Sequence, residues 1–208
     1  MTAQVSQNCW YLTAKRFFTF LFKTLFPVEI INADLMKREN KPYIVIANHR
    51  SVWDPLILMS VCPEQIRFLV KEELMQRPLL SKLAKKIDVI PVQRHASDIR
   101  AFRDCITALR NQCILGIFPE GTRYSGGSME SPEPGAAMLA MMQKVELLPV
   151  YISARPRLFH KTRVVVGEAL ASQTKITSEN LAKFSDEIKI RYRELRAEAS
   201  RRFYAAEE

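Results

Sequence analysis

The sequence predicts an α/β fold, with a mixed, mostly parallel sheet covered by helices on both faces and an N-terminal amphipathic, membrane-associating helix. Apolar runs of strand length alternate with segments of helical periodicity, the order that is typical of parallel α/β folds. Apolar residues make up 48% of the 208 residues and charged residues 25%, which favours a folded core over disorder. We expect an N-terminal segment over 1–27 and one larger domain over 28–208.

The first predicted element is a helix from Trp10 to Phe26, which Pro27 ends. Its aromatic and leucine side chains cover more than one helical face, and Lys15 and Lys23 add positive charge. Such a helix either packs on the domain or lies in a lipid interface with its cations toward the headgroups, and both interpretations remain open. Because no run approaches the roughly 20 apolar residues of a membrane span, we expect peripheral or monotopic attachment at the cytoplasmic face of a membrane.

Strands and helices are expected to alternate through the larger domain. The predicted strands are Tyr43–Ala47, Arg67–Val70, Val89–Val92, Ile114–Phe118, Leu147–Ile152 and Arg163–Val166. The predicted helices are Pro55–Cys62, Leu74–Ile87, a helix capped by Ser97, Gly135–Gln143 and a long final helix from about Ser178. In sheets of this kind, functional sites gather at the carboxyl ends of the strands.

Charge and cysteine usage limit the classes of partner. Lys and Arg outnumber Asp and Glu by 31 to 22, so the net charge of +9 favours anionic partners such as phosphate-bearing substrates, an anionic membrane surface or nucleic acid. No nucleic-acid-binding motif is present, so we expect no nucleic-acid partner. The four cysteines, Cys9, Cys62, Cys105 and Cys113, have no metal-binding spacing and are expected to be reduced and mostly buried.

The first chemical motif runs from Asn48 to Asp54, directly after the strand that ends at Ala47. A histidine at a strand end, here His49, can act as a general base, and Asp54 can fix its tautomer in the manner of a catalytic triad without the serine. The hydroxyl group of a substrate would then replace the serine. The alternative is structural: Asp54 caps the helix that Pro55 begins, and His49 is an ordinary loop residue.

The second motif runs from Phe118 to Arg123, after the strand that begins at Ile114. Gly121 permits a tight turn or the close approach of a substrate, and Arg123 presents a planar fork that suits phosphate. Thr122 adds a hydroxyl donor, and Glu120 can accept a hydrogen bond from a substrate hydroxyl or brace the arginine. The alternative is a Pro-Glu-Gly turn with a surface arginine.

Together the two motifs resemble the lysophosphatidic-acid acyltransferase family of the glycerolipid acyltransferase superfamily. An Asn-His-x4-Asp block at 48–54 and an intact Phe-Pro-Glu-Gly-Thr-Arg block at 118–123 stand in the family's order. Two weaker blocks also fit, a strand that ends at Arg94 and a later strand that contains Pro149. The resemblance extends over about 27–167, most of the chain.

The resemblance implies acyl transfer from acyl-CoA or acyl-carrier protein to the sn-2 hydroxyl of 1-acyl-sn-glycerol 3-phosphate, which gives phosphatidic acid. His49 would be the general base and Asp54 its partner. The residues implied to bind the substrate are Asn48, Arg94, Glu120, Gly121, Thr122 and Arg123. No bound metal or cofactor is implied, because the thioester itself supplies the activation.

Two other functions remain open. The same mechanism can serve a different acceptor, such as another lysophospholipid, glycerol 3-phosphate or a lyso-aminolipid. Glu133 stands near a position where the family often has a lysine, which leaves the acceptor headgroup undecided. A non-catalytic lipid-binding protein on the same fold is the second alternative, although the intact His49 and Asp54 argue against it.

Overall fold

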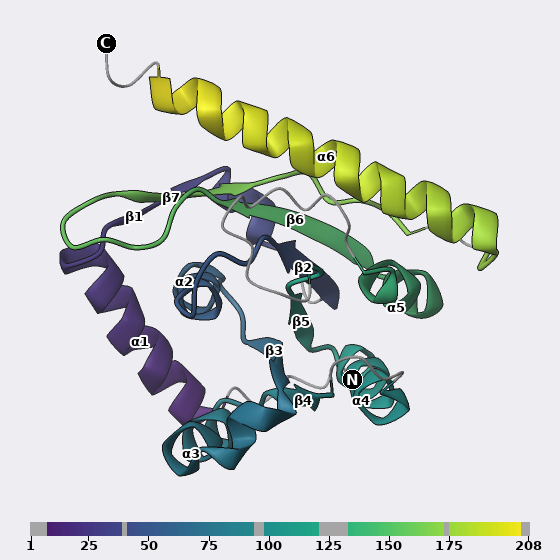
Figure 1. Cartoon of the computed structure of the whole chain (residues 1–208), viewed down its shortest axis with the longest axis horizontal. Helices are drawn as coiled ribbons and strands as arrows, with labels where there is room; N and C mark the ends of the chain where they lie inside the picture. The colour runs from purple at the N-terminus through teal and green to yellow at the C-terminus, as the bar shows by residue number, and fades with distance from the viewer. Residues whose placement is uncertain (1–7, 39–40, 94–97, 121–132, 173–174, 205–208) are drawn as a thin grey trace.

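The computed structural model describes residues 8–38, 41–93, 98–120, 133–172 and 175–204 (Figure 1). Their strands form one seven-stranded sheet in the order β1-β7-β6-β2-β5-β3-β4. Every neighbouring pair is parallel except β6 and β7, which are antiparallel. The prediction of a mixed, mostly parallel α/β sheet is therefore confirmed.

The centre of the sheet is the most apolar part of the chain. The strands are β1 (Val28–Ile31), β2 (Tyr43–Ala47), β3 (Ile66–Lys71), β4 (Ile90–Val92), β5 (Ile114–Ile117), β6 (Glu146–Ile152) and β7 (Thr162–Val166). All residues of β2 and β5 are buried, as expected for parallel strands that are covered on both faces. The two strands that precede the chemical motifs therefore lie side by side in the middle of the sheet.

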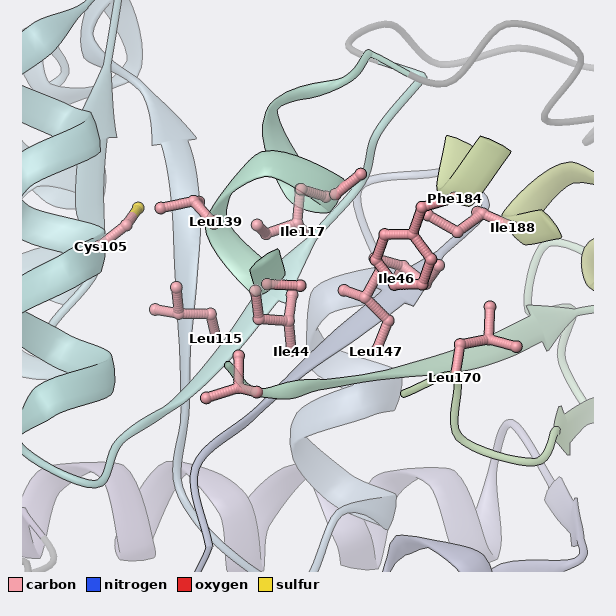
Figure 2. Packing of buried hydrophobic residues seen from close by; sticks show 14 of the residues in the cluster. Ile44, Ile46, Cys105, Leu115, Ile117, Leu139, Leu147, Leu170, Phe184 and Ile188 are labelled. Carbon is pink, nitrogen blue, oxygen red and sulfur yellow. The ribbon is translucent and has the colours of Figure 1, made fainter. Parts of the chain in front are cut away.

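Helices cover both faces of this sheet, and alternate side chains of each strand supply the two cores. Ile44 and Ile46 of β2 pack with α4 (Ile99–Arg110), α5 (Gly135–Gln143) and α6 (Ser178–Tyr204). Figure 2 shows this side, where Phe184 and Ile188 of α6 lie against the sheet. Val45 points the other way, into a core that it shares with α1 (Cys9–Thr24) and α2 (Asp54–Val61).

Three local features differ from the sequence predictions. The helix expected over 74–87 divides into a 3-10 helix, Glu72–Gln76, and α3, Pro78–Lys86, because Pro78 disfavours helical backbone at the residue before it. The predicted cap of α4 was wrong: Asp98 is the N-cap and accepts a hydrogen bond from the Ala101 amide at 3.0 Å, while Ser97 lies outside the described residues. Strand β1 and the 3-10 helix Ala33–Met36 were not predicted.

Helix α1 packs on the domain and also presents an apolar outer surface. The Tyr11 hydroxyl accepts a hydrogen bond from the Ile66 amide at 3.0 Å, and the Lys15 ammonium donates to the carbonyl of Cys62 at the end of α2. In contrast, Phe17 and Phe20 are 60% and 69% exposed. None of the described helices combines the length and apolarity that a bilayer crossing requires. The membrane role of α1 and the division at residue 27 stay predictions.

The four cysteines have no disulfide bonds between them, and they differ in burial. Cys62 and Cys105 are buried, Cys113 is half-buried and Cys9 is exposed. Burial raises the pKa of the Cys62 thiol to about 11 and that of Cys105 to about 12, so neither is a reactive thiolate near neutral pH.

Gly116 provides a direct test of the packing between β5 and β3. A Cβ atom at this position would lie 2.5 Å from the Phe68 ring and 2.8 Å from the Ile66 side chain. We expect Gly116→Ala to lower the free energy of unfolding by about 1–3 kcal/mol in urea denaturation, because it overpacks the core. Gly135→Ala is the matched control, since nothing lies within 4 Å of its added Cβ. Equal stability of the two variants would contradict this packing.

Candidate active site

The two sequence motifs meet at the carboxyl ends of β2 and β5. These strands are parallel neighbours, with Ile46 paired to Ile117, so the segments that follow them leave the sheet together. The imidazole of His49 stacks on the Phe118 ring with centroids 4.4 Å apart, and the His49 amide donates to Glu120 Oε2 at 3.3 Å. The chemical groups that the sequence separates by about seventy residues therefore form one site.

The carboxylate of Asp54 organises the first motif. It has no solvent-accessible surface, and its Oδ2 atom lies 2.9 Å from His49 Nδ1. The same oxygen accepts hydrogen bonds from the backbone amides of Arg50 at 2.6 Å and Ser51 at 2.7 Å. The Ser51 hydroxyl donates to the other oxygen, Oδ1, at 2.8 Å. The loop from His49 to Ser51 thus wraps around one buried carboxylate whose acceptor positions are occupied.

Asp54 is not the cap of α2. The helix begins at Asp54 itself, Trp53 is the N-cap residue without a side-chain capping bond, and Pro55 lies in the first turn. The carboxylate turns back to the preceding loop because four donors converge on it there. The capping interpretation was therefore wrong, although the position of Asp54 in the first turn still suits the helix dipole.

This geometry fixes the tautomer of His49. An ionised carboxylate only accepts hydrogen bonds, so Nδ1 carries the proton that faces Asp54 and Nε2 is left with its lone pair. Among the described residues, Nε2 has no hydrogen-bond partner. The His49 side chain is 14% exposed, so the ring is largely enclosed but not sealed from solvent. A neutral histidine held in this way can accept a proton at Nε2.

Asn48 has a different place from the one expected. Its side chain is fully buried, its Nδ2 donates to the Ile152 carbonyl at 2.9 Å, and its Oδ1 accepts from the Ile152 amide at 2.8 Å. The amide group therefore ties the end of β2 to the end of β6, in place of a backbone ladder. Asn48 thus positions the strand end from which His49 projects, and its expected contact with substrate stays a prediction.

Four of the expected substrate-binding residues lie outside the described residues: Arg94, Gly121, Thr122 and Arg123. Their roles stay predictions. Among the residues of the second motif that are expected to bind substrate, Glu120 is the one that the structure describes, and its carboxylate contacts the backbone of the first motif.

The structure also adds residues that sequence reasoning missed. The Arg50 guanidinium donates to the Ser153 carbonyl, and Arg155 Nε donates to the Arg50 carbonyl at 2.9 Å. These bonds join the motif loop to the segment between β6 and β7. Trp53 contacts the rings of Phe22 and Phe26, with centroids 6.3 and 5.8 Å apart, and so joins the same loop to α1. Arg50 and Trp53 stand inside the motif, but nothing in the sequence marks their distant partners.

No group of three or more metal-ligating side chains occurs in the parts of the chain that the structure describes.

Comparison with known proteins identifies the family. The family model described as Acyltransferase matches residues 28–153, more than half of the chain. A 1-acyl-sn-glycerol-3-phosphate acyltransferase of Bacillus subtilis is 33% identical over 172 residues, which cover 76% of this chain and 85% of that protein. The chain belongs to the lysophosphatidic-acid acyltransferase family.

Two further similar proteins have names that state the same activity. A 1-acyl-sn-glycerol-3-phosphate acyltransferase of Streptococcus pneumoniae is 30% identical over 121 residues, which span 57% of this chain but only 44% of that longer protein. The crystal structure of the 1-acyl-sn-glycerophosphate (LPA) acyltransferase PlsC from Thermotoga maritima superimposes with a TM-score of 0.67 and 26% identity. The match covers 89% of this chain and 76% of that one, so the likeness extends over most of both chains.

The Asp54 network predicts a large loss of activity in Asp54→Asn. The substitution keeps an oxygen that can accept from the loop amides but removes the charge that stabilises a protonated His49. By analogy with the aspartate of serine-protease triads, we expect kcat for acyl transfer to fall about 10³–10⁴-fold. Ser51→Ala is the control, because it removes a single hydrogen bond to Asp54 and should lose less than about tenfold. Similar losses in both variants would contradict a specific role for the charge of Asp54.

Proposed function

We propose that this chain transfers a fatty acyl group from acyl-CoA or acyl-carrier protein to the sn-2 hydroxyl of 1-acyl-sn-glycerol 3-phosphate, giving phosphatidic acid. The observation that carries the proposal is the His49–Asp54 pair at 2.9 Å, held at the end of β2 with the Phe118–Glu120 segment beside it. The names of the Bacillus and Streptococcus relatives support the choice of acceptor.

The proposed reaction uses His49 first as a base and then as an acid. Nε2 takes the proton of the acceptor hydroxyl while the hydroxyl oxygen attacks the thioester carbonyl. The tetrahedral intermediate then collapses, the carbon–sulfur bond breaks, and the leaving thiolate takes the proton from His49. An ester and a free thiol result, and the histidine returns to its neutral form. Asp54 stabilises the positively charged imidazolium between these two steps.

The second motif supplies the proposed acceptor site. Arg123 and Arg94 would hold the phosphate, since arginine binds phosphate through two parallel hydrogen bonds. Glu120, Thr122 and Gly121 would position the glycerol. The contact between Glu120 and the His49 amide supports this arrangement, because it places the second motif against the base. No bound metal or cofactor has a part in the proposal.

We further propose that the enzyme is a peripheral or monotopic protein at the cytoplasmic face of an anionic membrane. The outer face of α1 supports this location. Trp10, Phe17 and Phe20 are more than half exposed on it, and the exposed Arg16 and Lys23 flank them. Aromatic side chains with neighbouring cations are typical of helices that lie in a lipid interface.

The reaction is tested by offering labelled acyl-CoA and acyl-carrier protein with a panel of lysolipid acceptors. We expect product from 1-acylglycerol 3-phosphate that falls at least about 10³-fold in His49→Asn. Asparagine can still donate to Asp54 but cannot accept the substrate proton, so this variant separates catalysis from folding. If product forms only with another acceptor of the panel, the proposed acceptor would be wrong while the mechanism would stand. Equal product from wild type and variant would exclude His49 as the base.

The same mechanism predicts a pH dependence. Protonated imidazole has no lone pair at Nε2, so the wild-type rate should fall as the medium is made acidic. The residual rate of His49→Asn should lack this decline, which initial rates between acidic and neutral pH would show. A flat wild-type profile would contradict proton transfer as the rate-limiting event.

A further inference from the structure

The segment between β6 and β7 carries an apolar turn that nothing in the described fold covers. A bridge between Arg157 and His160 closes the turn and leaves Leu158 and Phe159 at its tip, 51% and 69% exposed. Phe159 has a left-handed backbone with φ of 59°, which is uncommon for a bulky residue. Its amide donates to the Leu25 carbonyl at 2.7 Å, so the strained tip is held in place against the end of α1.

A basic cavity of about 600 Å³ lies beside this turn. Its lining includes Arg50, Arg155, Arg157 and Lys161, together with His160, and no acidic side chain. Within the described chain, Arg155, Arg157 and Lys161 form no ion pair with a carboxylate. Several cations around one hollow repel each other, so the cavity is suited to an anion such as phosphate.

The turn and the cavity lie near both the catalytic loop and α1. Arg50 follows His49 directly and lines the cavity, and Arg155 donates to its carbonyl. At the other side, the tip contacts the end of α1, where Leu25 is itself exposed. Figure 1 shows the green β6–β7 segment reaching the end of α1, on the side of the sheet away from α6.

An exposed apolar tip is unfavourable in water, and together with the neighbouring cations it suits the surface of an anionic bilayer. Leucine and phenylalanine gain free energy when they leave water for the acyl chains, while cations gain from anionic headgroups at the same depth. We propose that the β6–β7 segment is a second membrane contact, in which Arg157 and Lys161 bind the phosphate of an anionic phospholipid and Leu158 and Phe159 enter the bilayer. This inference rests on the membrane location proposed above for α1.

Contacts through both α1 and the β6–β7 segment would fix the orientation of the enzyme on the membrane. With α1 as the single contact, the protein could rotate about the axis of that helix, and a second contact beyond the end of α1 would prevent this rotation. The motif loop lies between them, since Trp53 packs on α1 and Arg50 lines the cavity. The His49 site would then face the bilayer, where a lysolipid acceptor resides.

Sedimentation of the full chain with phospholipid vesicles tests the proposal. In vesicles with about one-third phosphatidylglycerol in phosphatidylcholine, we expect Arg157→Gln with Lys161→Gln to weaken binding about 25-fold, from about fivefold for each cation. Arg193→Gln with Arg196→Gln is the matched control, because these exposed arginines lie on α6, across the sheet from α1. On pure phosphatidylcholine, the two double variants should bind alike.

The apolar tip is tested separately with Leu158→Ser and Phe159→Asn, since asparagine tolerates the left-handed backbone at the second position. We expect this double variant to weaken binding to both kinds of vesicle by at least about tenfold, because it removes the two apolar side chains that would leave water for the bilayer. Ile190→Ser, at an exposed residue of α6, should bind like wild type.

Vesicle sedimentation measures membrane binding and involves no acyl transfer, so its outcome does not depend on whether the proposed reaction is correct. Wild-type affinity for anionic vesicles in both β6–β7 double variants would overturn the proposal. Normal vesicle binding with weakened binding of acyl-CoA in Arg157→Gln with Lys161→Gln would also overturn it and would assign the cavity to the phosphates of the donor.

Discussion

The candidate site depends on one buried carboxylate. Asp54 accepts hydrogen bonds from His49, from two backbone amides of the loop and from the Ser51 hydroxyl. A buried carboxylate is strongly unfavourable unless donors surround it, so the loop is folded around the charge and the charge is stabilised by the loop. The proposed role of His49 as a base rests on the same constraint, because the bond to Asp54 leaves the lone pair of Nε2 free to accept a proton.

The sheet supplies the frame for this carboxylate. Parallel β2 and β5 bring His49 against Phe118, and Asn48 fastens the end of β2 to Ile152 of β6, so His49 projects from a strand end that is held on both sides. Trp53 extends the frame to α1 through its aromatic contacts. A helix with an exposed aromatic surface and the loop from His49 to Asp54 are thus parts of one packed unit, so the proposed membrane contact and the candidate site share one frame.

Local sequence patterns were sufficient to predict the central strands β2 and β5 and the pairing of His49 with Asp54. The apolar runs that became β2 and β5 have a clear length and position, and the spacing of His49 and Asp54 allows only a short loop between them. The edge strand β1 was not predicted because its four residues show too little periodicity. Its partner β7 lies more than 130 residues away in the sequence. The role of Asn48 was missed for the same reason, since it is decided by Ile152, 104 residues further on.

The proposed mechanism requires that Asp54 hold His49 as the tautomer protonated at Nδ1. Nitrogen NMR of the chain labelled in its three histidines measures this directly, and His49→Asn identifies the signals of His49. At neutral pH we predict a protonated Nδ1 and an unprotonated Nε2 in the wild type, and a mixture of tautomers in Asp54→Asn. A proton on Nε2 of wild-type His49, with Nδ1 bare, would contradict the proposed base and the hydrogen-bond network from which it is derived.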